Sequence, residues 1–173
     1  HTSLKVCGIT SAEDAQQCVI LEIPAIGINF WPSSKRYTSP EDAHQFLQPL
    51  AGKIIRVGVF VNADPAIPLE LLKNNTIDIA QFHGDETPDY TTPFKNKNLP
   101  FIKAIGVKNT DSLKNITQFQ ADAILLDAHA PGIYGGTGDA FDWNLAKKFI
   151  TDHPQLPVIL AGGITPENAQ QAT

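Results

Sequence analysis

The sequence predicts a (β/α)8 barrel of the TIM-barrel class, and three observations support this prediction. Short, apolar, β-branched segments alternate with helical patterns along the whole chain, which is typical of a parallel sheet buried on both faces. The β-then-α units recur roughly every 20–30 residues. Polar residues follow the ends of several strands, where barrels of this class build their active sites. A doubly wound open sheet is the alternative, but no dinucleotide-binding glycine fingerprint follows the first strand.

Seven strands are predicted, and each is followed by a predicted helix. The strands span 4–9, 25–30, 54–61, part of 77–83, 101–107, 123–127 and 157–160. The helices begin at 10 or 11, 39, 62, 87, 109, 143 and 165, and the first, second, third, fifth and sixth end near 21, 50, 74, 119 and 151. Either Thr10 or Ser11 can cap the first helix, and Pro40 is typical of a first helical position.

A closed barrel of this class has eight strands, and only seven are predicted here. An open edge would leave backbone donors and acceptors unpaired. We therefore expect residues 1–173 to form a single barrel domain whose eighth βα unit is absent. We expect the natural protein to continue for on the order of 30 residues.

Length and composition limit the possible functions. The 173 residues carry a net charge of -5 and are 42% hydrophobic, which suits one domain with a sizeable core. The absence of a basic stripe argues against nucleic acid as a partner, and no apolar run reaches the length of a membrane span. The N-terminal residues lead directly into a strand pattern, so we predict no signal peptide.

Cysteine and histidine usage indicates the compartment and argues against a metal site. Cys7 and Cys18 do not make a disulfide framework, which fits a reduced, cytoplasmic protein. No Cys/His cluster has zinc-ligand spacing, so we predict no metal. We expect a monomer or a homodimer.

Cys7 and Asp127 are the candidate catalytic residues. Cys7 lies near the end of the first strand, just before a predicted helix N-terminus, where a thiolate can serve as a base or nucleophile. Asp127 ends the sixth strand, where a buried carboxylate needs a role or a partner. An inert buried cysteine and an aspartate that caps the following loop are the structural alternatives.

Two glycine-rich segments are candidate substrate-binding loops. After the sixth strand comes a long loop with Gly132, Gly135, Gly136 and Gly138, and long loops of this kind are usually functional or disordered. After the seventh strand come Gly162 and Gly163, before a predicted helix start. In barrels, this position supplies backbone N–H groups to a phosphate.

Arg36 and His83 are the other candidate binding residues. Arg36 follows the second strand beside Lys35, and a guanidinium can pair with a carboxylate or a phosphate. A solvated surface charge is the alternative for Arg36. His83 either lines the mouth of the barrel or is a hydrogen-bonded histidine at a strand end.

An ordered set of motifs resembles the phosphoribosylanthranilate isomerase family of tryptophan biosynthesis. Each motif is short, but together they span the chain in the family's order. They are K-V-C-G-I-T at 5–10, G-I-N-F-W-P-S-S-K-R-Y at 27–37, V-G-V-F-V-N at 57–62, Q-F-H-G at 81–84, L-L-D at 125–127, G-G-T-G-D-A-F-D-W at 135–143 and L-A-G-G-I-T-P-E-N at 160–168.

The resemblance implies an Amadori rearrangement without cofactor or metal. The expected substrate is N-(5-phospho-β-D-ribosyl)anthranilate, and the expected product is 1-(2-carboxyphenylamino)-1-deoxy-D-ribulose 5-phosphate. The family pattern places the general base on Cys7, the general acid on Asp127 and recognition of the anthranilate carboxylate on Arg36. It places phosphate binding on Gly162 and Gly163.

The resemblance also implies that the loop 135–143, with Gly136 and Gly138, folds over the substrate. Two other readings stay open from the sequence. One is a related phosphosugar barrel, such as the isomerase of histidine biosynthesis or a pentose-phosphate epimerase. The other is a non-catalytic barrel fragment that binds a phosphorylated ligand, which fold alone does not exclude.

Overall fold

The computed structural model describes residues 3–128 and 142–172. Within them, seven strands form one sheet in the order β1-β2-β3-β4-β5-β6-β7. The strands are β1 Lys5–Cys7, β2 Ala25–Asn29, β3 Ile55–Phe60, β4 Ile79–Phe82, β5 Phe101–Val107, β6 Ala123–Ala128 and β7 Val158–Leu160. Every neighbouring pair is parallel. The predicted parallel order is confirmed, with strand ends shifted by one or a few residues.

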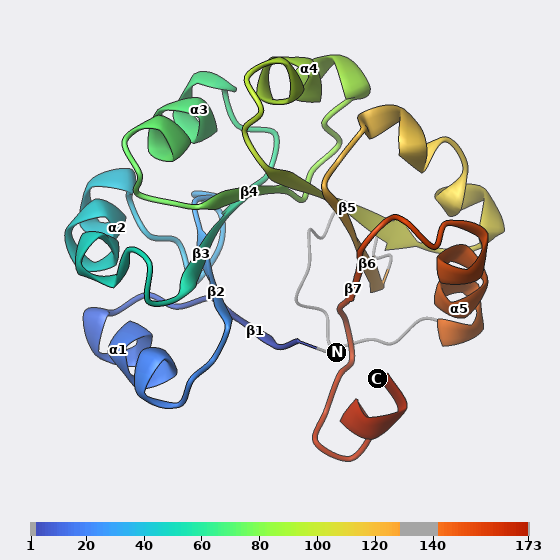
Figure 1. Ribbon diagram of the computed structural model, residues 1–173, viewed down its shortest axis with the longest axis horizontal. Helices are drawn as coiled ribbons and strands as arrows, with labels where there is room; N and C mark the ends of the chain where they lie inside the picture. The colour runs from blue at the N-terminus through green and yellow to red at the C-terminus, as the bar shows by residue number, and fades with distance from the viewer. Residues whose placement is uncertain (1–2, 129–141, 173) are drawn as a thin grey trace.

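Within the described residues there are five α-helices, and they lie on the outside of the curved sheet (Figure 1). They are α1 Ala12–Ile20, α2 Pro40–Leu47, α3 Ala66–Lys73, α4 Pro88–Asn96 and α5 Trp143–Asp152. Side-chain oxygens cap most of them, because the first N–H groups of a helix lack partners within it. Ser11, Ser39 and Thr87 each accept a hydrogen bond from the N–H three residues later.

Two of the predicted helices are wrong. The segment 109–119 forms two 3-10 turns, η2 Thr110–Leu113 and η3 Ile116–Phe119. Asn115 has a φ of 61° in the left-handed region, which a continuous α-helix does not permit. The side chains of Asn109 and Ser112 also bond to nearby backbone N–H groups, and such local bonds compete with a helix.

The helix predicted to start at Thr165 is the second error. A turn covers residues 166–168, and the 3-10 helix η4 Ala169–Ala172 follows. The Asn168 side chain accepts from the Thr165 N–H at 2.7 Å and donates to the Gly163 carbonyl at 2.8 Å. These bonds hold a compact turn where the proline had suggested a helix. A further 3-10 helix, η1 Gln48–Leu50, extends α2.

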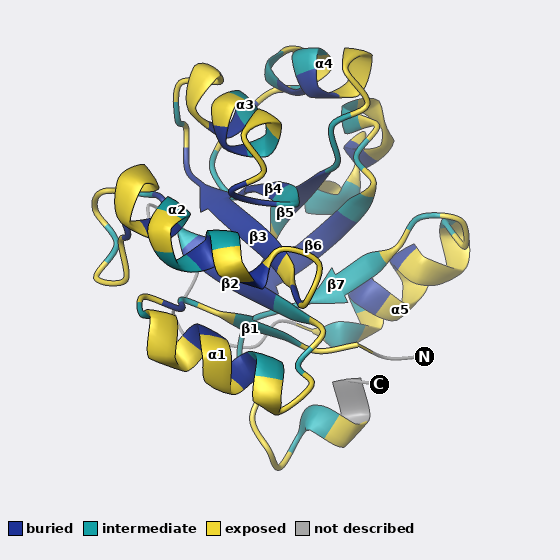
Figure 2. Ribbon diagram, turned by 60° about the vertical axis from the view of Figure 1, so that its left-hand side comes forward, coloured by how far each residue is buried: buried dark blue, intermediate teal, exposed yellow. Residues whose placement is uncertain are grey.

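The core has two layers, one on each face of the sheet. Alternate strand residues such as Ile26, Phe60 and Phe82 pack outward against the helices. The opposite set, which includes Val57, Ile102 and Leu125, packs in the interior of the curved sheet. Most residues of β2 to β6 are buried, β7 is half-buried, and the outer helix faces are exposed (Figure 2). Because side chains alternate along a strand, the same interior face continues to the C-terminal strand ends.

Candidate active site

The predicted site residues lie at one edge of the sheet. Cys7 ends β1, Asp127 is the second-last residue of β6, and His83 directly follows β4. Arg36 lies in the loop after β2. Since parallel strands all end at the same edge, these four residues from distant parts of the sequence share one face of the molecule.

Cys7 lies beside a glycine that leaves room for its side chain. Gly27 is its partner on β2, and a Cβ at Gly27 would lie 2.7 Å from the Cys7 Sγ and 3.2 Å from the Lys5 Nζ. Any larger residue would displace the sulfur. Cys7 is a free, exposed thiol, so its sulfur can meet a ligand.

Arg36 packs against the backbone just after Cys7. Gly8 has a φ of +90°, and a Cβ there would lie 2.6 Å from the Arg36 Cδ. The Arg36 Nη1 donates to the Cys7 carbonyl at 3.4 Å. The structure thus places a cation next to the thiol-bearing strand end, and the exposed guanidinium keeps other donors free for an anion.

His83 and Asp127 contact one another directly. The His83 Nε2 lies 3.1 Å from the Asp127 Oδ2, and the other carboxylate oxygen accepts from the Ala128 N–H at 2.8 Å. Asp127 is 6% exposed. The predicted partner for this buried carboxylate is therefore present. His83 is within reach of the candidate acid, in addition to any contact with a substrate.

Gln81 is a site residue that the sequence analysis did not single out. Its Nε2 lies 3.0 Å from the His83 Nδ1, so Gln81, His83 and Asp127 form a hydrogen-bonded row. Gln81 and His83 stand two residues apart, on the same face of the β4 segment. That spacing was the available signal in the sequence.

Gly162 and Gly163 follow β7, with φ angles of 80° and 64°. These left-handed conformations suit glycine and turn the chain beyond the strand end. The helix N-terminus expected behind them is replaced by the turn described above. Gly136 and Gly138, with the rest of the predicted covering loop up to residue 141, lie outside the described residues.

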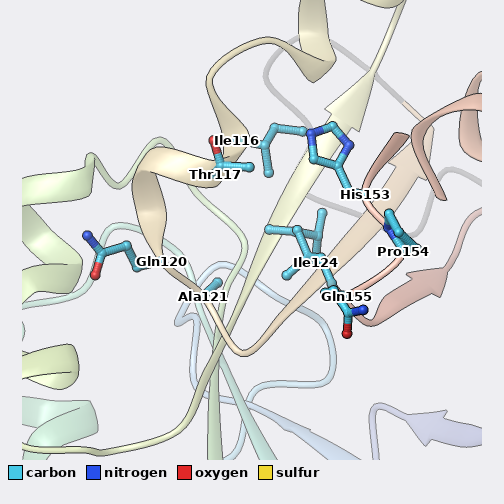
Figure 3. Close-up of a pocket in the computed structure, with 9 residues that line it drawn as sticks. Ile116, Thr117, Gln120, Ala121, Ile124, His153, Pro154 and Gln155 are labelled. Atoms are coloured by element: carbon cyan, nitrogen blue, oxygen red, sulfur yellow. The ribbon is translucent and has the colours of Figure 1, made fainter. Parts of the chain in front are cut away.

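A pocket in the described residues lies at the other end of the sheet. It has a volume of about 340 Å³ and is mainly apolar, and Ile116, Ile124 and Leu156 are among its lining residues. Figure 3 shows it between η3 and the segment that leads into β7. Ile124 is near the start of β6, whereas Asp127 is near its end. The pocket is therefore separate from the candidate site. Among the described residues, no group of three potential ligands is placed to hold a metal ion.

Comparison with known proteins identifies the family. A family model described as N-(5'phosphoribosyl)anthranilate (PRA) isomerase matches residues 4–173. The chain belongs to this family. An N-(5'-phosphoribosyl)anthranilate isomerase of Nitrosomonas europaea is 42% identical over 171 residues, which cover 98% of this chain and 78% of that protein. The match favours this family over the two other readings of the sequence.

Solved structures of the family share the fold. The phosphoribosyl anthranilate isomerase of Thermotoga maritima aligns with a TM-score of 0.85 and 34% identity over 99% of this chain and 82% of that chain. Another phosphoribosyl anthranilate isomerase was solved in complex with reduced 1-(o-carboxyphenylamino)-1-deoxyribulose 5-phosphate. It aligns with a TM-score of 0.82 and 33% identity over 99% and 81% of the two chains. The (β/α)8 class is thereby confirmed, with seven of its strands in the described residues.

Proposed function

We propose that this chain catalyses the Amadori rearrangement of N-(5-phospho-β-D-ribosyl)anthranilate, with Asp127 as general acid and Cys7 as general base. The observation that carries the assignment is the convergence of Cys7, Arg36, His83 and Asp127 at one sheet edge, in a chain that belongs to the PRA isomerase family. The relative solved with a reduced aminodeoxyribulose phosphate supports the substrate class.

Asp127 acts first in the proposed sequence. It donates a proton to the furanose ring oxygen, the C1–O bond breaks, and the nitrogen lone pair forms a Schiff base at C1. A carboxylic acid in a buried position is suited to this step. Asp127 is only 6% exposed, so bulk water has little access to its carboxyl group. The His83 ring is placed to hydrogen-bond to the carboxylate that proton transfer leaves.

Cys7 completes the reaction. The cationic Schiff base acidifies the C2 hydrogen, and the Cys7 thiolate removes it as a proton. The electron pair forms a C1–C2 double bond, which gives an enolamine that tautomerises to the ketone. The hydrogen moves as a proton, so the reaction needs no hydride carrier. Cys7 reaches the substrate from β1 while Asp127 reaches it from β6.

Two other features suit the substrate's charged groups, and a third would cover the substrate. The Arg36 guanidinium would pair with the anthranilate carboxylate. The backbone at Gly162 and Gly163 would hold the phosphate. Gly136 and Gly138 belong to the loop that we propose covers the substrate and excludes water. We place His83 in the substrate-binding site, where it bonds to Asp127 beside the reacting end of the substrate.

The proposed chemistry also bears on the cellular setting. A base at Cys7 must remain a free thiol, and the cytoplasm keeps thiols reduced, so we infer a cytoplasmic location. None of the described helices is long and apolar enough to cross a membrane. We expect one barrel domain, as a monomer or a homodimer, that binds a phosphorylated small molecule and no nucleic acid.

The proposal is tested by measuring turnover of freshly generated phosphoribosylanthranilate. The loss of the substrate's fluorescence reports the turnover. In the full-length protein, Cys7→Ser and Asp127→Asn should each lower kcat by about 10²- to 10⁴-fold, the usual contribution of acid–base catalysis. Cys18→Ser is the matched control, since Cys18 is buried in α1 away from the site, and its kcat should stay within twofold of wild type. Activity that survives either site variant would contradict the assigned pair.

A further inference from the structure

Gln81 has an amide whose two ends are in different situations. The side chain is 1% exposed. Its Nε2 faces the His83 Nδ1 at 3.0 Å, while its Oε1 is buried and accepts no hydrogen bond within the described part of the chain. A buried acceptor without a partner costs free energy, so such a group in a native site needs an explanation.

With Nε2 of Gln81 facing the ring, one tautomer of neutral His83 is favoured. An amide nitrogen only donates, so the His83 Nδ1 must accept. In neutral imidazole the other nitrogen then carries the proton, and the Nε2–H donates to the Asp127 Oδ2 at 3.1 Å. This arrangement suits Asp127 as a carboxylate, which only accepts.

A protonated Asp127 requires the opposite arrangement. Its O–H would donate to the His83 Nε2, so Nδ1 would carry the ring proton and need an acceptor. The Oε1 of Gln81 is that acceptor if the amide turns by half a rotation. The two ends of an amide have nearly the same shape, so both orientations fit the same space.

We propose that Gln81 is a positioning residue that sets the tautomer of His83, and that rotation of its amide lets His83 remain bonded to Asp127 in both protonation states. The unpartnered Oε1 is then the acceptor held for the second state. The inference rests on the proposed role of Asp127 as general acid and extends it to Gln81, which reaches Asp127 through His83.

The protons balance across the two states. With Asp127 ionised, the pair holds one proton, on the His83 Nε2. With Asp127 protonated, it holds two, one on the carboxyl and one on Nδ1. Asp127 takes up the added proton from water. It transfers this proton to the furanose ring oxygen when it acts as the general acid. His83 keeps one proton throughout, which it exchanges through water from Nδ1 to Nε2.

Nitrogen NMR of the histidine side chains tests the tautomer without any turnover. The full-length protein would be labelled with ¹⁵N at histidine, and His83 would be assigned by the loss of its signals in His83→Leu. In the free wild type we expect the proton on Nε2. An ionised carboxylate in Gln81→Glu only accepts, so we expect Nδ1 to carry a proton in that variant, whether or not Nε2 keeps its proton toward Asp127. An unprotonated Nδ1 in Gln81→Glu would overturn the inference.

Kinetics distinguish positioning from packing. Gln81→Met keeps the side-chain volume but removes both polar atoms, so we expect kcat to fall about tenfold with KM within twofold of wild type. In a His83→Leu background the same change should alter kcat less than twofold, because the row is already broken. Gln118→Met on exposed η3 is the control for the chemical change.

Each outcome bears on one of the two proposals. An equal loss from Gln81→Met in both backgrounds would show a packing effect and overturn the role of Gln81, while leaving the isomerase proposal intact. Absence of turnover in wild type would refute the isomerase proposal, and the NMR comparison would still decide whether Gln81 sets the tautomer. Near-ultraviolet circular dichroism of each variant would verify its tertiary packing.

Discussion

At the scale of single residues, two glycines make the site possible by leaving space. Gly27 makes room for the Cys7 sulfur, and Gly8 allows the Arg36 side chain to lie across the backbone. Gly8 also has a positive φ, but Gly27 does not. Substitution at Gly27 therefore tests space alone, without backbone strain.

We expect Gly27→Ala to lower kcat about 10- to 100-fold, because displacement of a reacting group by about 1 Å can cost that much. The Cβ would meet the Cys7 Sγ at 2.7 Å, so the sulfur must move. Gly52→Ala is the control, since a Cβ there meets nothing within 4 Å. It should cost stability through its positive φ but leave kcat unchanged. Steady-state kinetics with wild-type activity in Gly27→Ala would contradict this view of the site.

Arg56 is a residue that serves stability rather than catalysis. It is fully buried on β3 and bonded to Asp78, at 2.7 Å for the closest ion-pair contact. It also donates to the Leu47 and Asn75 carbonyls. Burial raises the pKa of Asp78, but the hydrogen bonds and charge of Arg56 outweigh it, so the pKa lies below 3.8.

The lowered pKa of Asp78 gives its contribution a defined pH range. A carboxyl with a depressed pKa stabilises the fold above its unfolded value of 3.8 and loses that effect as pH falls through the folded value. Asp78→Asn should therefore destabilise the protein at pH 7 by about 3 kcal/mol, the low end for a broken buried pair, because Asp78 is partly exposed. Urea unfolding should show this difference shrinking below about pH 4. A constant difference down to pH 2 would be inconsistent with the ion pair.

At the scale of elements, a buried ion pair joins the loop before α4 to β5, and its carboxylate also bonds to the loop after β3. The Lys103 Nζ on β5 lies 2.9 Å from the Glu86 Oε2, and Glu86 also accepts from the Asn62 and Gly84 N–H groups. Both charged side chains are nearly inaccessible to solvent. Because Glu86 bonds to the Gly84 N–H, this pair fixes the backbone that follows His83. The pair therefore helps to orient His83, although neither of its side chains has a role in the proposed reaction.

Removal of one partner should cost more than removal of both charges. Lys103→Met leaves Glu86 as a buried, uncompensated charge, with an expected loss of about 3–5 kcal/mol. Adding Glu86→Gln removes that charge and keeps an acceptor for the two N–H groups, so the double variant should be more stable than Lys103→Met alone, by about 1 kcal/mol or more. Thermal unfolding would measure both. Lys114→Met, in an exposed pair, should change stability by less than about 1 kcal/mol.

At the scale of the whole molecule, the described sheet has two edges, β1 and β7. The chain spans about four-fifths of the length of the relatives it matches. It covers 78% of the Nitrosomonas europaea protein and 82% of the Thermotoga maritima protein. Edge strands carry unpaired backbone groups. Both Cys7 on β1 and the glycines after β7 lie at these edges, so closure of the barrel bears directly on the site.

A protein limited to residues 1–173 should therefore be less stable than one extended to the length of its relatives. Each backbone bond formed by an additional strand contributes about 1 kcal/mol, so we expect a difference of about 3 kcal/mol or more in urea unfolding. Turnover should be higher in the longer protein. Equal unfolding midpoints and equal turnover would show that the seven strands suffice.

The sequence alone determined the strand order, the barrel class and the positions of Cys7, Arg36, His83 and Asp127 relative to the strand ends. These features follow from local patterns, because an apolar strand and the polar residues at its end are consecutive in the sequence. The helices at 109–119 and 165 were predicted wrongly, since side chains of Asn109 and Asn168 bond to the backbone in ways that composition does not reveal.

Only the tertiary structure decided which side chains meet. The contact of Arg36 with the chain after Cys7 depends on the space left by the missing Cβ of Gly8. The row from Gln81 through His83 to Asp127 joins β4 to β6, and His83 and Asp127 are 44 positions apart in the sequence. Hydrogen bonds are short-ranged and directional, so their partners are defined by the register of the strands and the curvature of the sheet. Local sequence patterns carry neither quantity.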